Sequence, residues 1–201
     1  MFMRSTSELR EEILAAARSE FARHGFAGAR IDRIAATASA SKERLYAHFG
    51  DKETLFREVL AANVAEFFQA VRMLPDDVPE FVGGMFDLSV RRPEHHRMVA
   101  WAHLEGLTLE PPSADGLPLP QLALAAIEEA QATGHVDASW DPTDLIVILL
   151  GIALAWAHWP DPAAATTSAA VLAGRRAAAV EAAARVIAPS AGTPPTASRS
   201  T

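Results

Sequence analysis

The stretch Ile31-Asp-Arg-Ile-Ala-Ala-Thr-Ala-Ser-Ala-Ser-Lys-Glu-Arg-Leu-Tyr-Ala-His-Phe49 predicts two short helices joined by a tight turn. Apolar residues recur at helical spacing over 31–38, and Leu45 and Phe49 lie four residues apart in the second helix, over 41–49. Neither helix is long enough to be stable alone, so both must pack against neighbours. A helix-turn-helix whose second helix has a polar outer face is the usual geometry of DNA readout.

The outer face of the second helix is what remains once Leu45 and Phe49 turn inward. It is mostly polar and includes two cations and a phenol, which suit contacts with phosphates and base edges. Its members are Lys42, Glu43, Arg44, Tyr46, Ala47 and His48. Any short amphipathic helix exposes such residues, so spacing alone leaves both a DNA-reading helix and an ordinary solvated face open.

Longer helices are predicted on either side of this stretch. Over 7–24 the apolar residues form a helical stripe, with Ser7 as the expected N-cap and Gly25 as the expected stop. A fourth helix starts near Asp51 and runs to about Arg72. These four helices form the first unit of the chain.

Three segments of this unit form a recognisable pattern. They are Phe21-Ala-Arg-His-Gly-Phe26, Ile34-Ala35 and Ser41-Lys-Glu-Arg-Leu-Tyr-Ala-His-Phe-Gly-Asp-Lys-Glu-Thr-Leu55. With them, residues 7–60 resemble the DNA-binding domain of the TetR family of bacterial transcriptional repressors. The string Leu-Tyr-x-His-Phe-x-x-Lys-x-x-Leu is highly specific to that family.

The resemblance implies an all-α fold in which an N-terminal three-helix helix-turn-helix domain is joined by a long helix to a C-terminal helical ligand-binding and dimerisation domain. It implies that the recognition helix begins with Lys42, Glu43 and Arg44 and that Tyr46 and His48 lie along its DNA face. Lys52 would add a contact from the start of the fourth helix. The expected DNA-binding residues are Arg30, Ser41, Lys42, Glu43, Arg44, Tyr46, His48 and Lys52.

Elementary electrostatics bears on two of these cations. Lys52 lies in the first turn of a helix, where free N–H groups favour an anion. A phosphate there would be stabilised both by a salt bridge with Lys52 and by the partial positive charge of the helix N-terminus. The alternative is that Lys52 is a solvated cation opposing the helix dipole. Arg30 stands where the family usually has a capping threonine. A cation at a helix N-terminus costs a few tenths of a kcal/mol unless an anion is near, so a DNA phosphate is its expected partner.

The turn between the two short helices also departs from the family pattern. Ser39-Ala40 replaces the usual Gly-Val. If the turn needs a left-handed residue, serine costs up to ~1–2 kcal/mol relative to glycine. The geometry of the turn is therefore left open, whereas the assignment of a helix-turn-helix motif does not depend on it.

Composition bounds the rest of the chain. The 201 residues are 50% hydrophobic, include no cysteine and have a formal net charge of −7. The absence of cysteine excludes disulfides and thiolate zinc sites, and 42 alanines against one tyrosine favour helices. Residues 1–60 hold ten Lys and Arg against nine Asp and Glu, whereas residues 61–201 hold eight against sixteen. The acidity thus belongs to the second unit, and the net +1 of the first does not exclude DNA as a partner.

Prolines divide the second unit into helices expected near 78–91, 94–107, 119–133, 142–159 and 164–188, with a loop over 109–120. The predicted domains are a DNA-binding domain over 1–60, an effector-binding and dimerisation domain over 61–188 and a disordered tail over 189–201. A palindromic DNA site requires a symmetric dimer. The apolar segment 144–159 and the alanine-rich segment 168–188 are the expected homodimer surface, unless the former is only the central helix of a monomeric core.

Large apolar side chains of the second unit could line a pocket for a small hydrophobic effector, with His103 and Glu105 as polar anchors. Core packing is the alternative role for each of them singly. The expected lining residues are Phe67, Phe81, Met85, Met98, Trp101, Leu104 and Trp156.

No enzyme motif is present: the sequence lacks a Gly-rich phosphate loop, a Gly-x-Ser-x-Gly elbow and a His-Glu-x-x-His pair. We therefore expect no catalytic residue, no cofactor and no metal site. The longest apolar run, 145–159, is shorter than the ~20 residues of a membrane span, and no secretory signal is visible, so we expect a cytoplasmic protein. The rival hypothesis is a helical ligand-binding or protein-interaction dimer that does not read DNA.

Overall fold

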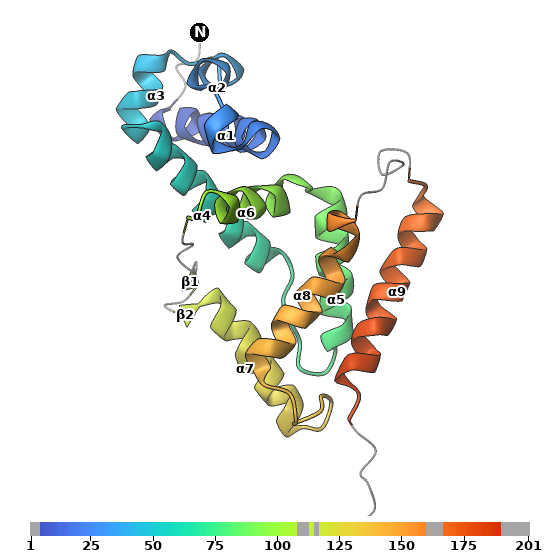
Figure 1. The fold of residues 1–201 in the computed structure, drawn as a ribbon. Helices are drawn as coiled ribbons and strands as arrows, with labels where there is room; N and C mark the ends of the chain where they lie inside the picture. The colour runs from blue at the N-terminus through green and yellow to red at the C-terminus, as the bar shows by residue number, and fades with distance from the viewer. Residues whose placement is uncertain (1–4, 108–112, 115–116, 160–166, 190–201) are drawn as a thin grey trace, which may run out of the picture.

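A computed structural model describes residues 5–107, 113–114, 117–159 and 167–189. Within these ranges the chain forms nine helices and one short antiparallel pair of strands, which confirms the all-α fold class (Figure 1). The helices are α1 (Thr6–Gly28), α2 (Ile31–Thr37), α3 (Lys42–Phe49), α4 (Lys52–Ala70), α5 (Val78–Arg91), α6 (Glu94–Leu104), α7 (Leu119–Ala132), α8 (Pro142–His158) and α9 (Ala169–Ile187). The strands are β1 (Ser113–Ala114) and β2 (Leu117–Pro118).

The first helix begins before the predicted cap. The Ser5 hydroxyl accepts a hydrogen bond from the Glu8 N–H at 3.1 Å, and Glu8 Oε2 accepts one from the Ser5 N–H at 2.7 Å. This reciprocal capping box satisfies two backbone donors that a helix start leaves unpaired. The N-cap predicted at Ser7 is therefore wrong. Gly25 has a φ of 67° and kinks α1, and helical residues continue beyond it to Gly28.

The turn between α2 and α3 does require a left-handed residue. Ser39 has a φ of 49°, and among the described residues other than glycine it alone has a positive φ. The Ala40 N–H donates to the Ala35 carbonyl at 2.9 Å, which closes the turn back onto α2. The condition left open by the sequence is therefore met, and the serine stores backbone strain.

Replacing Ser39 by glycine is expected to raise the free energy of unfolding by up to about 1 kcal/mol. Glycine removes the clash of Cβ in the left-handed region, and its greater freedom in the unfolded chain offsets part of the gain. Chemical denaturation of both proteins checks this. Ser39→Ala keeps the Cβ and should bring no gain, and a destabilised Ser39→Gly protein would contradict the strain.

The head, defined here as residues 5–60, has an aromatic core. The ring centroids of Phe21 and Phe56 are 4.9 Å apart in an edge-to-face arrangement, and Phe26 packs on Phe56 in the same way. Met98 and Ala102 of α6 are buried in this same core. The head is therefore not packed from its own residues alone, because α6 covers α1.

A second core lies among α5, α7, α8 and α9. Its buried members include Phe81, Met85, Ile127 and Leu145. Arg176 of α9 donates from Nε to Asp87 of α5 at 2.9 Å and also pairs with Glu80. The helix α4 runs from the head towards these helices, so it joins the two cores (Figure 1).

Most helix limits agree with the sequence within a few residues. The helix expected over 94–107 ends at Leu104, because Gly106 takes a φ of 67°. The helix expected over 164–188 is described from Ala169, where the Ser168 hydroxyl caps it by accepting from the Val171 N–H at 3.3 Å. The expected loop over 109–120 contains β1 and β2 and the start of α7. Most of the predicted disordered tail, 190–201, lies outside the described residues.

Candidate nucleic-acid interface and ligand pocket

The outer face of α3 lies at the end of the molecule away from α7 and α9 (Figure 1). Leu45 and Phe49 are buried in the head, as predicted. Tyr46 is 43% exposed, and His48 is half-buried with its ring centroid 6.0 Å from that of Phe49. The structure thus brings the predicted polar residues to one open surface, whose exposed members are Lys42, Glu43, Arg44, Tyr46 and Ala47.

Asp32 is the local counterion of two predicted DNA-binding cations. It pairs with Lys42, and its Oδ2 lies 3.7 Å from Arg30 Nη2. Arg30 is the N-cap residue of α2 and makes no capping hydrogen bond with its side chain. Exposed ion pairs of this kind are worth about 0–1 kcal/mol, so a phosphate can take the place of Asp32 at little cost.

The starts of α3 and α4 are both capped by side chains. The Ser41 hydroxyl accepts from the Arg44 N–H at 3.3 Å, which gives Ser41 a structural role. Asp51 Oδ1 accepts from the Thr54 N–H at 2.7 Å, and this bond holds the pKa of Asp51 below its ordinary value. The start of α4 therefore already has a carboxylate, whereas the sequence suggested an open anion site. Lys52 Nζ lies 4.8 Å from the centroid of the Phe26 ring.

Glu20 fixes the position of α2, which sequence reasoning missed. Its Oε1 accepts from the Arg30 backbone N–H at 2.9 Å and from Arg33 Nε at 2.8 Å. Burial alone would raise its pKa, but the hydrogen bonds from Arg33 and from the Arg30 N–H hold the pKa of Glu20 below its ordinary value. The ionised carboxylate ties the helix-turn-helix to α1.

A pocket of about 400 Å³ lies between α4, α6 and α8. This volume is in the range of small-molecule sites. The residues that line it are Asn63, Val64, Phe67, His95, His96, Val99, Ala100, His103, Leu150, Leu154 and His158. The wall is apolar along one part and contains an amide and four imidazoles along the other.

The residues predicted to line a pocket are distributed over several environments. Phe67 and the anchor His103 are on the wall of the pocket, and Glu105 is not. Phe81 and Met85 are buried in the second core and Met98 in the head core. Trp156 packs edge-on against Phe86, with ring centroids 5.7 Å apart. Leu104 is 77% exposed, and Trp101 packs on Gly25.

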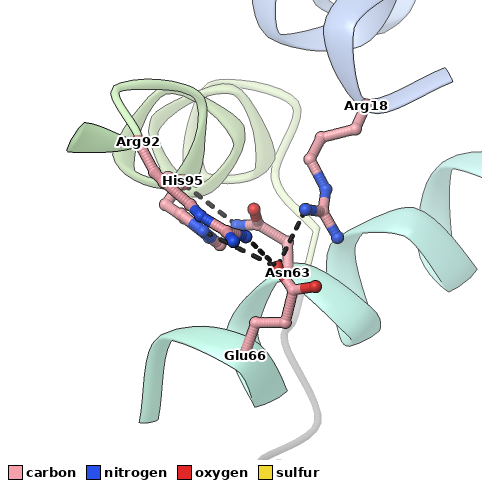
Figure 2. Close-up of polar contacts among 5 residues, drawn as sticks. All are labelled: Arg18, Asn63, Glu66, Arg92 and His95. Atoms are coloured by element: carbon pink, nitrogen blue, oxygen red, sulfur yellow. Dashed lines mark hydrogen bonds and ion pairs between the residues drawn. The ribbon is translucent and has the colours of Figure 1, made fainter. Parts of the chain in front are cut away.

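A polar cluster adjoins this pocket and was missed by sequence reasoning (Figure 2). Glu66 Oε2 accepts from Arg18 Nη1 at 2.8 Å and from Arg92 Nη1 at 3.1 Å, and it lies 3.7 Å from His95 Nε2. Asn63 donates from Nδ2 to the His95 carbonyl at 3.1 Å. One carboxylate on α4 therefore joins α1 of the head, the C-terminal end of α5 and the pocket wall at the start of α6.

The outer faces of α8 and of the first half of α9 are mostly apolar and exposed in the single chain. On α8, Val147 is 63% exposed, and Gly151 is exposed, with room for a Cβ atom. On α9 an exposed stripe includes Val171 and Gly174. An exposed apolar helix face with small residues is typical of a helix-packing interface.

Two other types of site are absent from the part of the chain that the structure describes. No helix there is long and apolar enough to cross a membrane. Nor do three or more His, Cys, Asp or Glu side chains there come together as a metal site.

Family models match both units of the chain. The model of bacterial regulatory proteins of the tetR family matches residues 13–59, and the model of the tetracyclin repressor-like C-terminal domain matches residues 77–185. The chain belongs to the TetR family. Its helix-turn-helix, α2 and α3, lies within the first match, and three of the four helices of the second core lie wholly within the second match.

Individual relatives agree with this assignment. The HTH-type transcriptional repressor SCO4008 of Streptomyces coelicolor is 35% identical over 160 residues, which are 79% of this chain and 81% of that protein. The repressor NicS of Pseudomonas putida is 36% identical over 102 residues, 47% of this chain and 48% of that protein. Among solved structures, the transcriptional regulator SCO4942 of Streptomyces coelicolor has a TM-score of 0.75 and 38% identity, covering 89% of this chain and 97% of that one.

Proposed function

We propose that this TetR-family chain is a transcriptional repressor that binds a palindromic operator as a homodimer and is released when a small apolar effector fills the pocket. The observation that carries the proposal is the open outer face of α3, with Lys42, Arg44 and Tyr46 exposed at the end of the molecule. Its family and relatives are transcriptional regulators, and we assign the chain no catalytic activity. Because chromosomal DNA is its partner, it acts in the cytoplasm.

The proposed contacts divide into two kinds. The first kind is contacts with phosphates from the cations at the starts of α2, α3 and α4, which are Arg30, Lys42 and Lys52. Such contacts fix the register of a protein on DNA. Arg44 and Tyr46 lie on the face of α3 that would enter the major groove. Glu43 is exposed, and hydrogen bonds from its own backbone and from Ser41 hold its pKa below the ordinary value. A carboxylate there accepts from a cytosine amino group rather than meeting a phosphate.

The proposed dimer interface is the exposed face of α8 and α9. Gly151→Arg should leave the monomer folded, because a Cβ at this position meets nothing within 4 Å. In the dimer the arginine would place an unpaired charge between helices, so the dissociation constant of the dimer should rise at least about a hundredfold. Analytical ultracentrifugation checks this, with Ala125→Arg on the exposed side of α7 as the control. A Gly151→Arg protein that dimerises as well as wild type would contradict the interface.

The pocket is suited to control the head because its walls also support the head. Val64 of α4 lines the pocket and is buried in the head core. His95 and Val99 of α6 line the pocket, while Met98 and Ala102 of the same helix are buried against α1. An effector that prefers one arrangement of α4 and α6 would therefore shift the position of the head.

The experiment that tests this function is binding of the full-length protein to the DNA that flanks its own gene. We expect a shifted complex whose affinity falls steeply between low and moderate salt, because bound cations release counterions from DNA. A screen for small molecules that dissociate the complex tests the effector. An affinity that does not change with salt would overturn the phosphate contacts, and no shift on any such DNA would favour a helical dimer that does not read DNA.

A further inference from the structure

Buried polar atoms without partners gather at the pocket. Among the described residues, four buried side-chain atoms have no hydrogen-bond partner, and they are Arg18 Nε, Asn63 Oδ1, His95 Nδ1 and His96 Nδ1. The last three belong to residues that line the pocket. Buried polar groups are nearly always satisfied, so three unsatisfied atoms on one wall indicate groups that await a ligand.

The neighbours of two of these atoms, Asn63 Oδ1 and His95 Nδ1, show that both are hydrogen-bond acceptors. Asn63 donates from Nδ2 to the His95 carbonyl, which can only accept, so the free atom is the carbonyl oxygen Oδ1, an acceptor. His95 Nε2 faces the Glu66 carboxylate at 3.7 Å, which favours the proton on Nε2 and leaves Nδ1 as an acceptor. Asn63 and His95 are 0% and 2% exposed, so both acceptors are removed from bulk water.

The charge around these acceptors disfavours a cationic ligand, and the neutral imidazoles offer no partner to an anionic one. Arg18 and Arg92 share the single carboxylate of Glu66, so this cluster has a net positive charge that opposes a further cation (Figure 2). Burial, followed by the charge of Arg18, lowers the pKa of His95. Burial, followed by the neighbouring His158, lowers the pKa of His96. Both imidazoles are neutral at neutral pH, and neither supplies a cation for a carboxylate.

We propose that the effector of this pocket is a neutral, mostly apolar molecule with an N–H or O–H group that donates to Asn63 Oδ1 and His95 Nδ1. The body of the molecule lies against the apolar wall formed by Val64, Phe67, Val99, Leu150 and Leu154. An anion would meet two acceptor atoms, and a cation would meet the charge of the arginine pair. This inference rests on the proposed function, since it names the chemical class of its effector.

Four probes of nearly the same shape separate the classes. They are 2-naphthamide, which is neutral and donates, 2-naphthoate, an anion, 2-naphthamidine, a cation at neutral pH, and 2-isopropylnaphthalene, which has no polar group. We expect 2-naphthamide to bind the full-length protein about tenfold more tightly than each of the other three, because it alone satisfies the acceptors without adding charge. Isothermal titration calorimetry at neutral pH measures the four affinities.

Two variants test whether Asn63 of the pocket wall causes the preference for the amide probe. Asn63→Leu removes the acceptor, so its preference for the amide over the isopropyl probe should fall to about threefold or less, while the isopropyl probe binds as before. Gln69→Leu also replaces a side-chain amide by leucine, at an exposed position of α4, and should keep the wild-type preference. Circular dichroism shows whether each variant is folded. If Asn63→Leu does not fold, the four-probe comparison on the wild-type protein still decides the class.

The outcomes separate this inference from the proposed function. A carboxylate, amidine or isopropyl probe that binds as tightly as the amide overturns the ligand class and leaves a ligand pocket in place. If the unsatisfied atoms bind only water, the amide probe has no advantage over the others, and the ligand class is again overturned while the pocket stays in place. If none of the four probes binds, both the class and the effector pocket are overturned. Operator binding by the same samples reports separately on DNA recognition.

Discussion

Replacing Tyr46 and Lys52 together by alanine is expected to weaken operator binding at least about a hundredfold while the chain stays folded. A good contact to a base edge is worth about 1–3 kcal/mol, and each substitution occurs twice in a dimer. The slope of log affinity against log salt should fall by about two, since one phosphate contact is lost in each protomer. Tyr46 is exposed, and Lys52 contributes one contact with the Phe26 ring, so the head should lose little stability.

The matched control for this double variant is Val90→Ala with Arg91→Ala. These residues are an exposed apolar side chain and an exposed cation on α5, outside the head. Fluorescence anisotropy with operator DNA should give the control the affinity and salt slope of wild type. Equal affinities for the double variant, the control and wild type would exclude α3 as the reading helix.

Local features of the head could be predicted from sequence because they depend on neighbours within a few residues. The burial of Leu45 and Phe49 follows from their spacing, and the open N-cap at Arg30 follows from the absence of a capping side chain. The left-handed turn at Ser39 could be stated only as a condition, because serine does not reveal whether its φ is positive.

Contacts between residues that are far apart in the sequence could not be predicted from the spacing of apolar and charged residues. Asp32 is one of many exposed acids in the sequence, and nothing local shows that it pairs with Lys42 and neighbours Arg30. The lining of the pocket depends on how α4, α6 and α8 cross, and an amphipathic pattern does not distinguish a residue that faces a pocket from one that faces the core. Met98 was therefore expected at the pocket but is buried in the head core, and Asn63 was overlooked.

The packing of Trp101 on Gly25 is the sharpest example of such a distant contact, and it gives the second large effect. A Cβ atom at Gly25 would lie 2.7 Å from Trp101 Cε3, and Gly25 has a φ of 67° and a ψ of −178°, a region that essentially only glycine occupies. Gly25→Ala is therefore expected to lower the free energy of unfolding by about 2–4 kcal/mol, from backbone strain of about 1–3 kcal/mol and from overpacking. Chemical denaturation measures this loss.

The matched control is Gly134→Ala. Gly134 has a φ of 78°, but a Cβ there would meet nothing within 4 Å, so the substitution should cost only the backbone term of about 1–2 kcal/mol. In a Trp101→Leu background the cost of Gly25→Ala should shrink towards the backbone term, because the smaller side chain leaves room for the methyl group. If Gly25→Ala cost no more than Gly134→Ala in the wild-type background, where Trp101 is present, α6 could not lie against α1 as described. The route from the pocket through α6 to the head would then have no physical basis.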